Sequence, residues 1–210
     1  MRKHQMGLAA FDLDGTLLRG ETVCEAIARQ MGHLERMREL EGLRDQAEIL
    51  AGRAELARYY RTVTVAELQS YLAVLRLAPG VEAGFRLLRH QGLKIALVSI
   101  TWEFAVAWFA RTLGADYYLG TGLSPDGHIT HVWPADKARW VTALAGTLGL
   151  PLEAVAAVGD SWGDADMLRV VGRPFFVGVT RPAELEQVPH YPHSDMYAIA
   201  QRIVETSPDD

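Results

Sequence analysis

Four short, mostly apolar runs recur along the chain, and each is followed by polar residues or glycine. They are Leu8–Leu13, Leu93–Ile100, Ala154–Gly159 and Phe175–Val179. Apolar runs that do not alternate with polar positions are typical of parallel strands covered by helices on both faces. We therefore predict buried parallel strands at these positions.

Between these runs the apolar residues follow helical spacing, and three helical stretches end at a glycine. They are Val81–Gln91 before Gly92, Trp102–Leu113 before Gly114 and Lys137–Leu148 before Gly149. A glycine just past the last periodic residue is a common helix stop. Strands that alternate with such helices predict an α/β fold with a Rossmann-like, doubly wound parallel sheet. Asp126-Gly127 predicts a hairpin turn within it.

One segment interrupts this alternation, because Glu21–Leu77 contains helical spacing but no strand pattern. Thr64 and Glu67 have the spacing of a capping box, which predicts a helix from there to about Leu77. We interpret the segment as a helical insertion above the C-terminal end of the first strand. The expected division is a Rossmann-like catalytic core, residues 1–18 and 79–210, and a helical cap, residues 19–78.

Composition and charge exclude several classes of protein. Apolar residues make up 49% of the 210 residues, which is ordinary for a folded chain. The 21 basic and 26 acidic residues give a net charge of −5, which offers no general attraction to nucleic acid or to an anionic membrane. The apolar stretch after Arg2–His4 is too short for a signal peptide or a membrane span. We expect a cytoplasmic monomer or homodimer without nucleic-acid or membrane partners.

Lysine and cysteine are scarce, and this narrows the chemistry. The basic residues are 18 arginines and only three lysines: Lys3, Lys94 and Lys137. A role that demands lysine therefore has few candidates. The single cysteine, Cys24, excludes an internal disulfide and a multi-cysteine metal site.

Acidic residues follow two of the predicted strands. Asp12 and Asp14 lie two positions apart, so both carboxylates fall on the same side of the strand end. Asp160 and Asp164 follow the third predicted strand. An aspartate turn or a helix N-cap would give the same local sequences. Parallel strands, however, gather their C-terminal ends at the ligand-binding edge of a sheet, and four aspartates there would repel each other unless a cation such as Mg²⁺ joined them.

A hydroxyl and an ammonium group are expected at the same edge. Ser99 ends the second predicted strand and Lys137 begins a helix. Either could be an ordinary helix cap or a solvated surface charge. Together they could hold and neutralise phosphate oxygens.

Taken in order, these motifs resemble the haloacid dehalogenase superfamily of phosphatases. The resemblance implies that Asp12 is the nucleophile, forming an aspartyl-phosphate, and that Asp14 is the general acid and then the base. It implies that Mg²⁺ is held by Asp12, the Asp14 backbone carbonyl and Asp160, with Asp164 close behind. Ser99 and Lys137 would bind the phosphoryl oxygens.

Other branches of the superfamily fit less well. Asp14 argues against the dehalogenases, which lack the second acid. The phosphonate-cleaving members use a cap lysine, and Glu21–Leu77 contains no lysine.

The insertion is similar to the cap of phosphoserine phosphatases. That resemblance implies that Glu21 binds the ammonium group of the substrate and that Arg53 binds its carboxylate. Such a pair of charged side chains suits a zwitterionic amino acid. Two departures concern specificity: Ile100-Thr101 stands where the family has Gly-Gly, and the fourth motif carries Ser161 and Gly163.

We therefore expect a Mg²⁺-dependent phosphomonoester hydrolase that acts on a small phosphorylated metabolite, with O-phosphoserine as the leading substrate. One alternative is a phosphatase for another small metabolite, since Trp102 and Trp162 could favour a more apolar leaving group. Another is a phosphotransferase that uses the same aspartyl-phosphate. A phosphoamino-acid binder without activity would not need the second acid, Asp14.

Overall fold

The computed structural model describes residues 7–205, and its sheet has the strand order β4-β3-β2-β1-β5-β6. All neighbouring strands are parallel except β3 and β4. The strands are β1 (Leu8–Phe11), β2 (Lys94–Trp102), β3 (Tyr117–Leu123), β4 (Ile129–Thr130), β5 (Val155–Gly159) and β6 (Arg173–Phe176). The α-helices are α1 (Val23–Gln30), α2 (Leu34–Glu41), α3 (Gln46–Tyr60), α4 (Val65–Tyr71), α5 (Val81–His90), α6 (Glu103–Leu113), α7 (Pro134–Thr147), α8 (Ala165–Val170) and α9 (Met196–Glu205).

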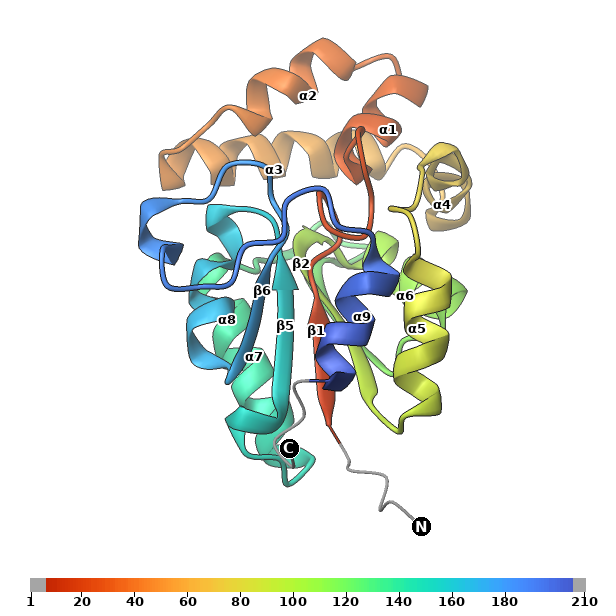
Figure 1. Ribbon diagram of the computed structural model, residues 1–210. Helices are drawn as coiled ribbons and strands as arrows, with labels where there is room; N and C mark the ends of the chain where they lie inside the picture. The colour runs from red at the N-terminus through yellow and green to blue at the C-terminus, as the bar shows by residue number, and fades with distance from the viewer. Residues whose placement is uncertain (1–6, 206–210) are drawn as a thin grey trace.

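Helices cover both faces of the sheet. Alternate residues of the central strands contribute to two separate apolar clusters, one under α5, α6 and α9 and the other under α7 and α8. Figure 1 shows α5 and α9 on one side of β1 and β5, and α7 and α8 on the other. This three-layer arrangement confirms the predicted α/β fold and explains why the strands are apolar without alternation.

The helices α1 to α4 lie between β1 and α5 in the chain and above the C-terminal ends of the strands (Figure 1). The chain leaves and re-enters the sheet layer at one place. The Arg19 N–H donates to the Arg76 carbonyl at 3.1 Å, and the Ala78 N–H donates to the Leu17 carbonyl at 2.8 Å. The two connections therefore form a short hydrogen-bonded ribbon.

The predicted strands and helix stops are found in the structure, with differences in extent. The strand predicted at Phe175–Val179 is β6, Arg173–Phe176, and the helix predicted to begin at Lys137 begins at Pro134. Gly92, Gly114 and Gly149 all have positive φ, as expected of helix stops. The helix predicted to reach Leu77 ends as an α-helix at Tyr71 and continues only as a 3₁₀ turn, and Thr64 accepts the Glu67 N–H at 3.2 Å. β3 was not predicted, because its two glycines hide the strand pattern.

Within the described part of the chain, no helix is long and apolar enough to cross a membrane.

Candidate active site

A buried lysine joins two aspartates at the C-terminal edge of the sheet. The Lys137 ammonium lies 2.7 Å from Asp12 Oδ1 and 2.6 Å from Asp164 Oδ1, and only 1% of the lysine is exposed. Asp160 completes the group: Asp12, Asp160 and Asp164 each place a carboxylate oxygen within 4.8 Å of the others. The structure thus brings together residues that lie 152 positions apart, from Asp12 to Asp164.

Three neighbouring elements place these side chains. Asp12 directly follows β1 and donates its N–H to the Val158 carbonyl of β5 at 2.9 Å, so it stays fixed to the sheet. Lys137 lies in the first turns of α7. The Asp160 N–H and the Ser161 N–H donate to Asp164 Oδ2 at 3.0 and 3.1 Å, which closes the turn after β5.

At this edge of the sheet, the backbone of two glycines lies directly against the side chains of two site aspartates. Gly15, with φ +82°, lies directly against the Asp160 carboxylate, and a side chain on Gly159 would come within 2.5 Å of Asp164. Thr16 donates its hydroxyl to Asp160 Oδ1 at 3.1 Å. These positions therefore need glycine because any side chain would displace an aspartate.

The site concentrates negative charge. Burial, together with Asp164 and Asp160, raises the pKa of Asp12 well above its ordinary value although Lys137 opposes the shift. Burial and Asp164 raise the pKa of Asp160 to about 6. Burial works against the charge of Lys137, but the attraction of Asp12 and Asp164 outweighs it and raises the pKa of the lysine.

The carboxylates fit a hard divalent cation such as Mg²⁺. Such ions prefer oxygen ligands and would relieve the repulsion among the aspartates, which adds to burial in raising the pKa values of Asp12 and Asp160. Asp164 has both oxygens engaged, one by Lys137 and the other by the Asp160–Ser161 turn. Among the described residues, Asp12 Oδ2 and Asp160 Oδ2 accept no hydrogen bond, so Asp12 and Asp160 are the carboxylates best placed to bind metal.

Asp14 lies beside this cluster in a different environment. Its Oδ1 accepts the Val23 N–H at the start of α1 at 2.8 Å. Burial is the largest influence and raises the pKa of Asp14 to about 7, while the Val23 hydrogen bond opposes the shift. A carboxyl group with a pKa near neutrality can both give and take a proton at working pH.

A cavity of about 440 Å³ opens between these aspartates and the overlying helices. Asp12, Asp14, Ser99 and Lys137 are among the residues that line it. The other walls are mostly apolar side chains, from the insertion and from loops of the sheet: Met37, Leu40, Leu43, Ile49, Leu56, Ile100, Trp102, Trp133 and Trp162. Ile100 and Trp162, which stand next to two of the motifs, therefore line the same cavity as the aspartates.

Arg53 and Glu21, the two residues predicted to bind the body of the substrate, lie in different places. Arg53 lines the cavity and contacts the loop before α7, donating to His131 Nδ1 at 3.0 Å and to the Val132 carbonyl at 3.1 Å. Glu21 does not line it; its carboxylate pairs with Arg29 at 2.7 Å. Arg53 therefore lines the same cavity as Asp12 and Asp14, and Glu21 does not.

Sequence reasoning did not identify Glu41, which lines the cavity and accepts the Thr22 hydroxyl at 2.7 Å. Burial raises its pKa. None of the motifs in the sequence includes it. Trp133 was also missed, although it lies four residues before Lys137.

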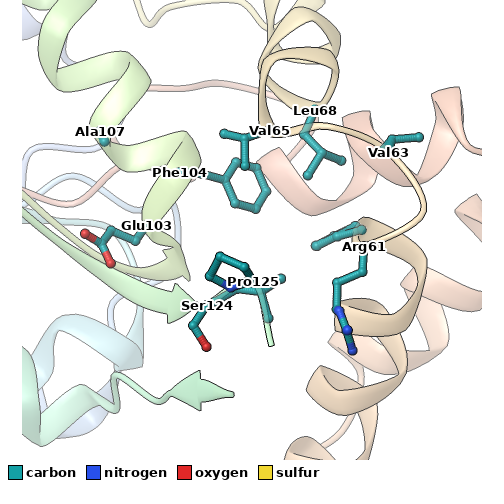
Figure 2. Close-up of a pocket in the computed structure, with 11 residues that line it drawn as sticks. Arg61, Val63, Val65, Leu68, Glu103, Phe104, Ala107, Ser124 and Pro125 are labelled. Atoms are coloured by element: carbon teal, nitrogen blue, oxygen red, sulfur yellow. The ribbon is translucent and has the colours of Figure 1, made fainter. Parts of the chain in front are cut away.

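A second cavity, of about 550 Å³, lies between the end of α3, α4 and the start of α6. Figure 2 shows Val63, Val65, Leu68, Phe104 and Pro125 around it, with the charged ends of Arg61 and Glu103 directed away from these apolar side chains. None of the predicted site residues lines it.

Comparisons with known proteins agree with the site. The family model for haloacid dehalogenase-like hydrolases matches residues 9–169. The phosphoserine phosphatase SerB2 of Mycobacterium tuberculosis is 33% identical over 79% of this chain and 42% of its own length. A phosphoserine phosphatase of Archaeoglobus fulgidus is 28% identical over 79% of this chain and 50% of its own. The chain thus spans about half the length of these relatives, or less.

One solved structure, of a phospho-aspartyl intermediate analogue of phosphoserine phosphatase, superimposes with a TM-score of 0.78. It is 21% identical and the match covers 94% of this chain and 99% of that one. At this identity the likeness establishes the shared fold.

Proposed function

The chain belongs to the haloacid dehalogenase-like hydrolases, and from that premise we propose that it is a Mg²⁺-dependent phosphomonoester hydrolase that forms an aspartyl-phosphate on Asp12. The contact of the buried Lys137 ammonium with Asp12, at 2.7 Å, carries the proposal. A carboxylate can attack a phosphate dianion only where fixed positive charge offsets their repulsion.

The residues fit a metal-assisted site. Asp12 and Asp160, with the backbone carbonyl of Asp14, would hold Mg²⁺, and Asp164 would hold Lys137 behind them. When bound, the ion would neutralise charge on the phosphoryl group. Lys137 and Ser99 would bind the phosphoryl oxygens.

In the first step a carboxylate oxygen of Asp12 forms a bond to phosphorus while the bond to the leaving alcohol breaks. Asp14 gives its proton to that alcohol. In the second step Asp14 takes a proton from water, the water oxygen attacks phosphorus, and phosphate leaves Asp12. A pKa of about 7 for Asp14 suits both roles.

O-phosphoserine is the leading substrate of the proposal. The relatives that carry this name support it, and so does Arg53, a cation on the cavity wall with no carboxylate partner among the described residues. Glu21 stays the predicted reader of the ammonium group, and Glu41 is a second carboxylate placed to do so. In the same proposal residues 19–78 act as a cap that closes over the core of residues 1–18 and 79–210.

Release of inorganic phosphate from O-phosphoserine tests the proposal, alongside phosphothreonine, phosphocholine, sugar phosphates and 4-nitrophenyl phosphate. We expect hydrolysis that EDTA abolishes and Mg²⁺ restores, with phosphoserine preferred. If the protein hydrolyses other esters but not phosphoserine, the hydrolase function stands and the assignment of phosphoserine as substrate is wrong. Glycerol or serine added as acceptor should yield no transfer product; a phosphorylated acceptor would instead identify a phosphotransferase. Hydrolysis of none of the esters would contradict the proposal.

A further inference from the structure

Arg53 combines partial burial with the lack of a carboxylate partner among the described residues. On the same insertion Arg29, Arg36 and Arg38 each pair with a glutamate, and Arg44, which also lines the cavity, is exposed and donates to two backbone carbonyls. Arg53 is half-buried, and the described residues offer it no carboxylate within ion-pair distance. Burial accordingly lowers its pKa. A half-buried cation without an anion is costly, and an anionic ligand would relieve that cost.

Three consecutive core residues, His131, Val132 and Trp133, form an uncharged shelf that contacts this guanidinium. The carbon at its centre lies 4.7 Å from the centre of the Trp133 ring, a cation–π contact. The His131 and Trp133 rings stack at 5.7 Å with an angle of 24°. The Val132 backbone between them accepts one N–H, and His131 Nδ1 accepts another.

The shelf engages only part of the guanidinium. Arginine carries five N–H donors in a fixed plane, and two of them are used by His131 and Val132. Arg53 and Trp133 line the cavity, whereas His131 and Val132 do not. The bonds to the shelf are therefore made away from the cavity, and the donors that remain are available to a molecule inside it.

We propose that Trp133 and His131 are specificity-determining positioning residues, which hold Arg53 with its unused donors ready for a carboxylate on the substrate. The inference rests on the proposed phosphatase function. His131 must accept the Arg53 N–H through Nδ1, so it acts as the neutral imidazole with its proton on Nε2. Trp133 immediately precedes α7, so the shelf also links the recognition of the substrate body to the helix that carries Lys137.

The test uses two substrates that differ only in the carboxylate, O-phosphoserine and O-phosphoethanolamine. The ratio of their kcat/KM values measures how well the carboxylate is read. Trp133→Leu and His131→Leu should each lower this ratio about tenfold, mainly through KM for phosphoserine, a size typical of losing one contact to a charged group. Trp133→Phe, which can still stack, and His131→Asn, whose carbonyl can still accept, should retain most of it.

A double-mutant cycle tests whether the shelf acts through Arg53. In an Arg53→Met background the ratio should already be low, and adding Trp133→Leu should not change it further. Trp108→Leu and His90→Leu, on α6 and α5 away from this cavity, are matched controls that should leave the ratio at its wild-type value.

Three results would overturn the inference: equal losses for both substrates, additive effects in the Arg53→Met background, or a wild-type enzyme without preference for phosphoserine, whether it cleaves both esters or neither. If that enzyme still hydrolyses 4-nitrophenyl phosphate, the proposed hydrolase function stands. Absence of hydrolysis with every ester, in the presence of Mg²⁺, would count against the proposed function itself.

Discussion

Lys137 shows at the scale of one residue how folding and chemistry depend on the same contacts. A buried ammonium group is tolerated only when it is paired, and both of its partners are aspartates of the site. Changing any of the three alters the charge of the others. Variants of this cluster therefore need a measurement of stability beside each measurement of rate.

Asp12→Asn should lower turnover by at least about a thousandfold, because an amide cannot attack phosphorus. The fold should persist, since burial and neighbouring carboxylates already disfavour the charge of Asp12. Steady-state phosphate release and the thermal unfolding midpoint check the two halves. Asp166→Asn, at a half-buried aspartate on α8 that pairs with Arg169, is the matched control and should keep full activity. An Asp12→Asn enzyme with more than a few per cent of wild-type rate would contradict the role.

Asp14→Asn should affect poor leaving groups most. An alkyl alcohol needs a proton as it departs, whereas 4-nitrophenol needs little help. We expect the burst of 4-nitrophenol from the first step to survive better than alcohol release from an alkyl phosphate. Rapid-quench measurement of both first steps decides the matter, and an equal loss for the two would argue against Asp14 as the acid.

At this scale the sequence predicted the residues that the ends of parallel strands bring together, such as Asp12 and Asp160. It could not predict Glu41 or His131, because their positions depend on how the insertion packs against a loop distant in sequence. Glu21 shows the same limit. Its spacing from Asp14 fits the family, but the structure pairs it with Arg29 outside the cavity, and its role stays a prediction.

At the scale of elements, α5 and α9 pack closely because of one glycine. A Cβ on Gly84 would lie 2.7 Å from the Met196 carbonyl oxygen and 3.2 Å from Ala200 Cβ. Gly84→Ala should therefore destabilise the protein by about 1–3 kcal/mol, the cost typical of overpacking. Kcat per folded molecule should not change.

Gly146→Ala is the matched control for this helix contact. Gly146 lies in α7, and its added methyl group would meet no described atom within 4 Å. Removing a helical glycine there should stabilise by about 0.4–1 kcal/mol. Urea unfolding of both variants tests the pair, and the same sign of change in both would refute the packing argument.

The elements were predictable where their patterns were strong. The apolar runs of β1, β2, β5 and β6 and the glycine stops indicated the sheet. The sequence pattern did not predict β3, because Gly120 and Gly122 interrupt the strand. A Cβ on Gly120 would lie 2.7 Å from Glu103 Cα. Tertiary packing against α6 thus requires a residue that local propensity disfavours in a strand.

For the whole molecule, the acidic site should make stability depend on pH when metal is removed. The pKa of Asp14 is raised from 3.8 to about 7 and that of Asp160 to about 6. The folded state thus binds more protons than the unfolded state, so its stabilisation is complete below about pH 4 and is lost as pH rises through 6 and 7. In EDTA the thermal unfolding midpoint should decrease as the pH is raised from 5 to 8.

Mg²⁺ should raise the unfolding midpoint more at pH 8 than at pH 5, because it binds the deprotonated carboxylates. Asp160→Asn should flatten the pH dependence in EDTA. Differential scanning calorimetry across this range provides the measurement. A midpoint that rises with pH in EDTA would show that the carboxylates do not dominate the linkage.

The ribbon where the insertion leaves and rejoins the sheet layer has an evolutionary and practical consequence. Leu18 and Leu77 face each other as an antiparallel bridge, so the two ends of a segment of almost 60 residues lie side by side. The sheet makes its pairings without the segment, and a foreign domain with adjacent termini could be grafted there without stretching β1. Such a graft would leave Asp12, Asp160, Asp164 and Lys137 in place, but it would take Arg53 away from Trp133 and the Val23 N–H away from Asp14.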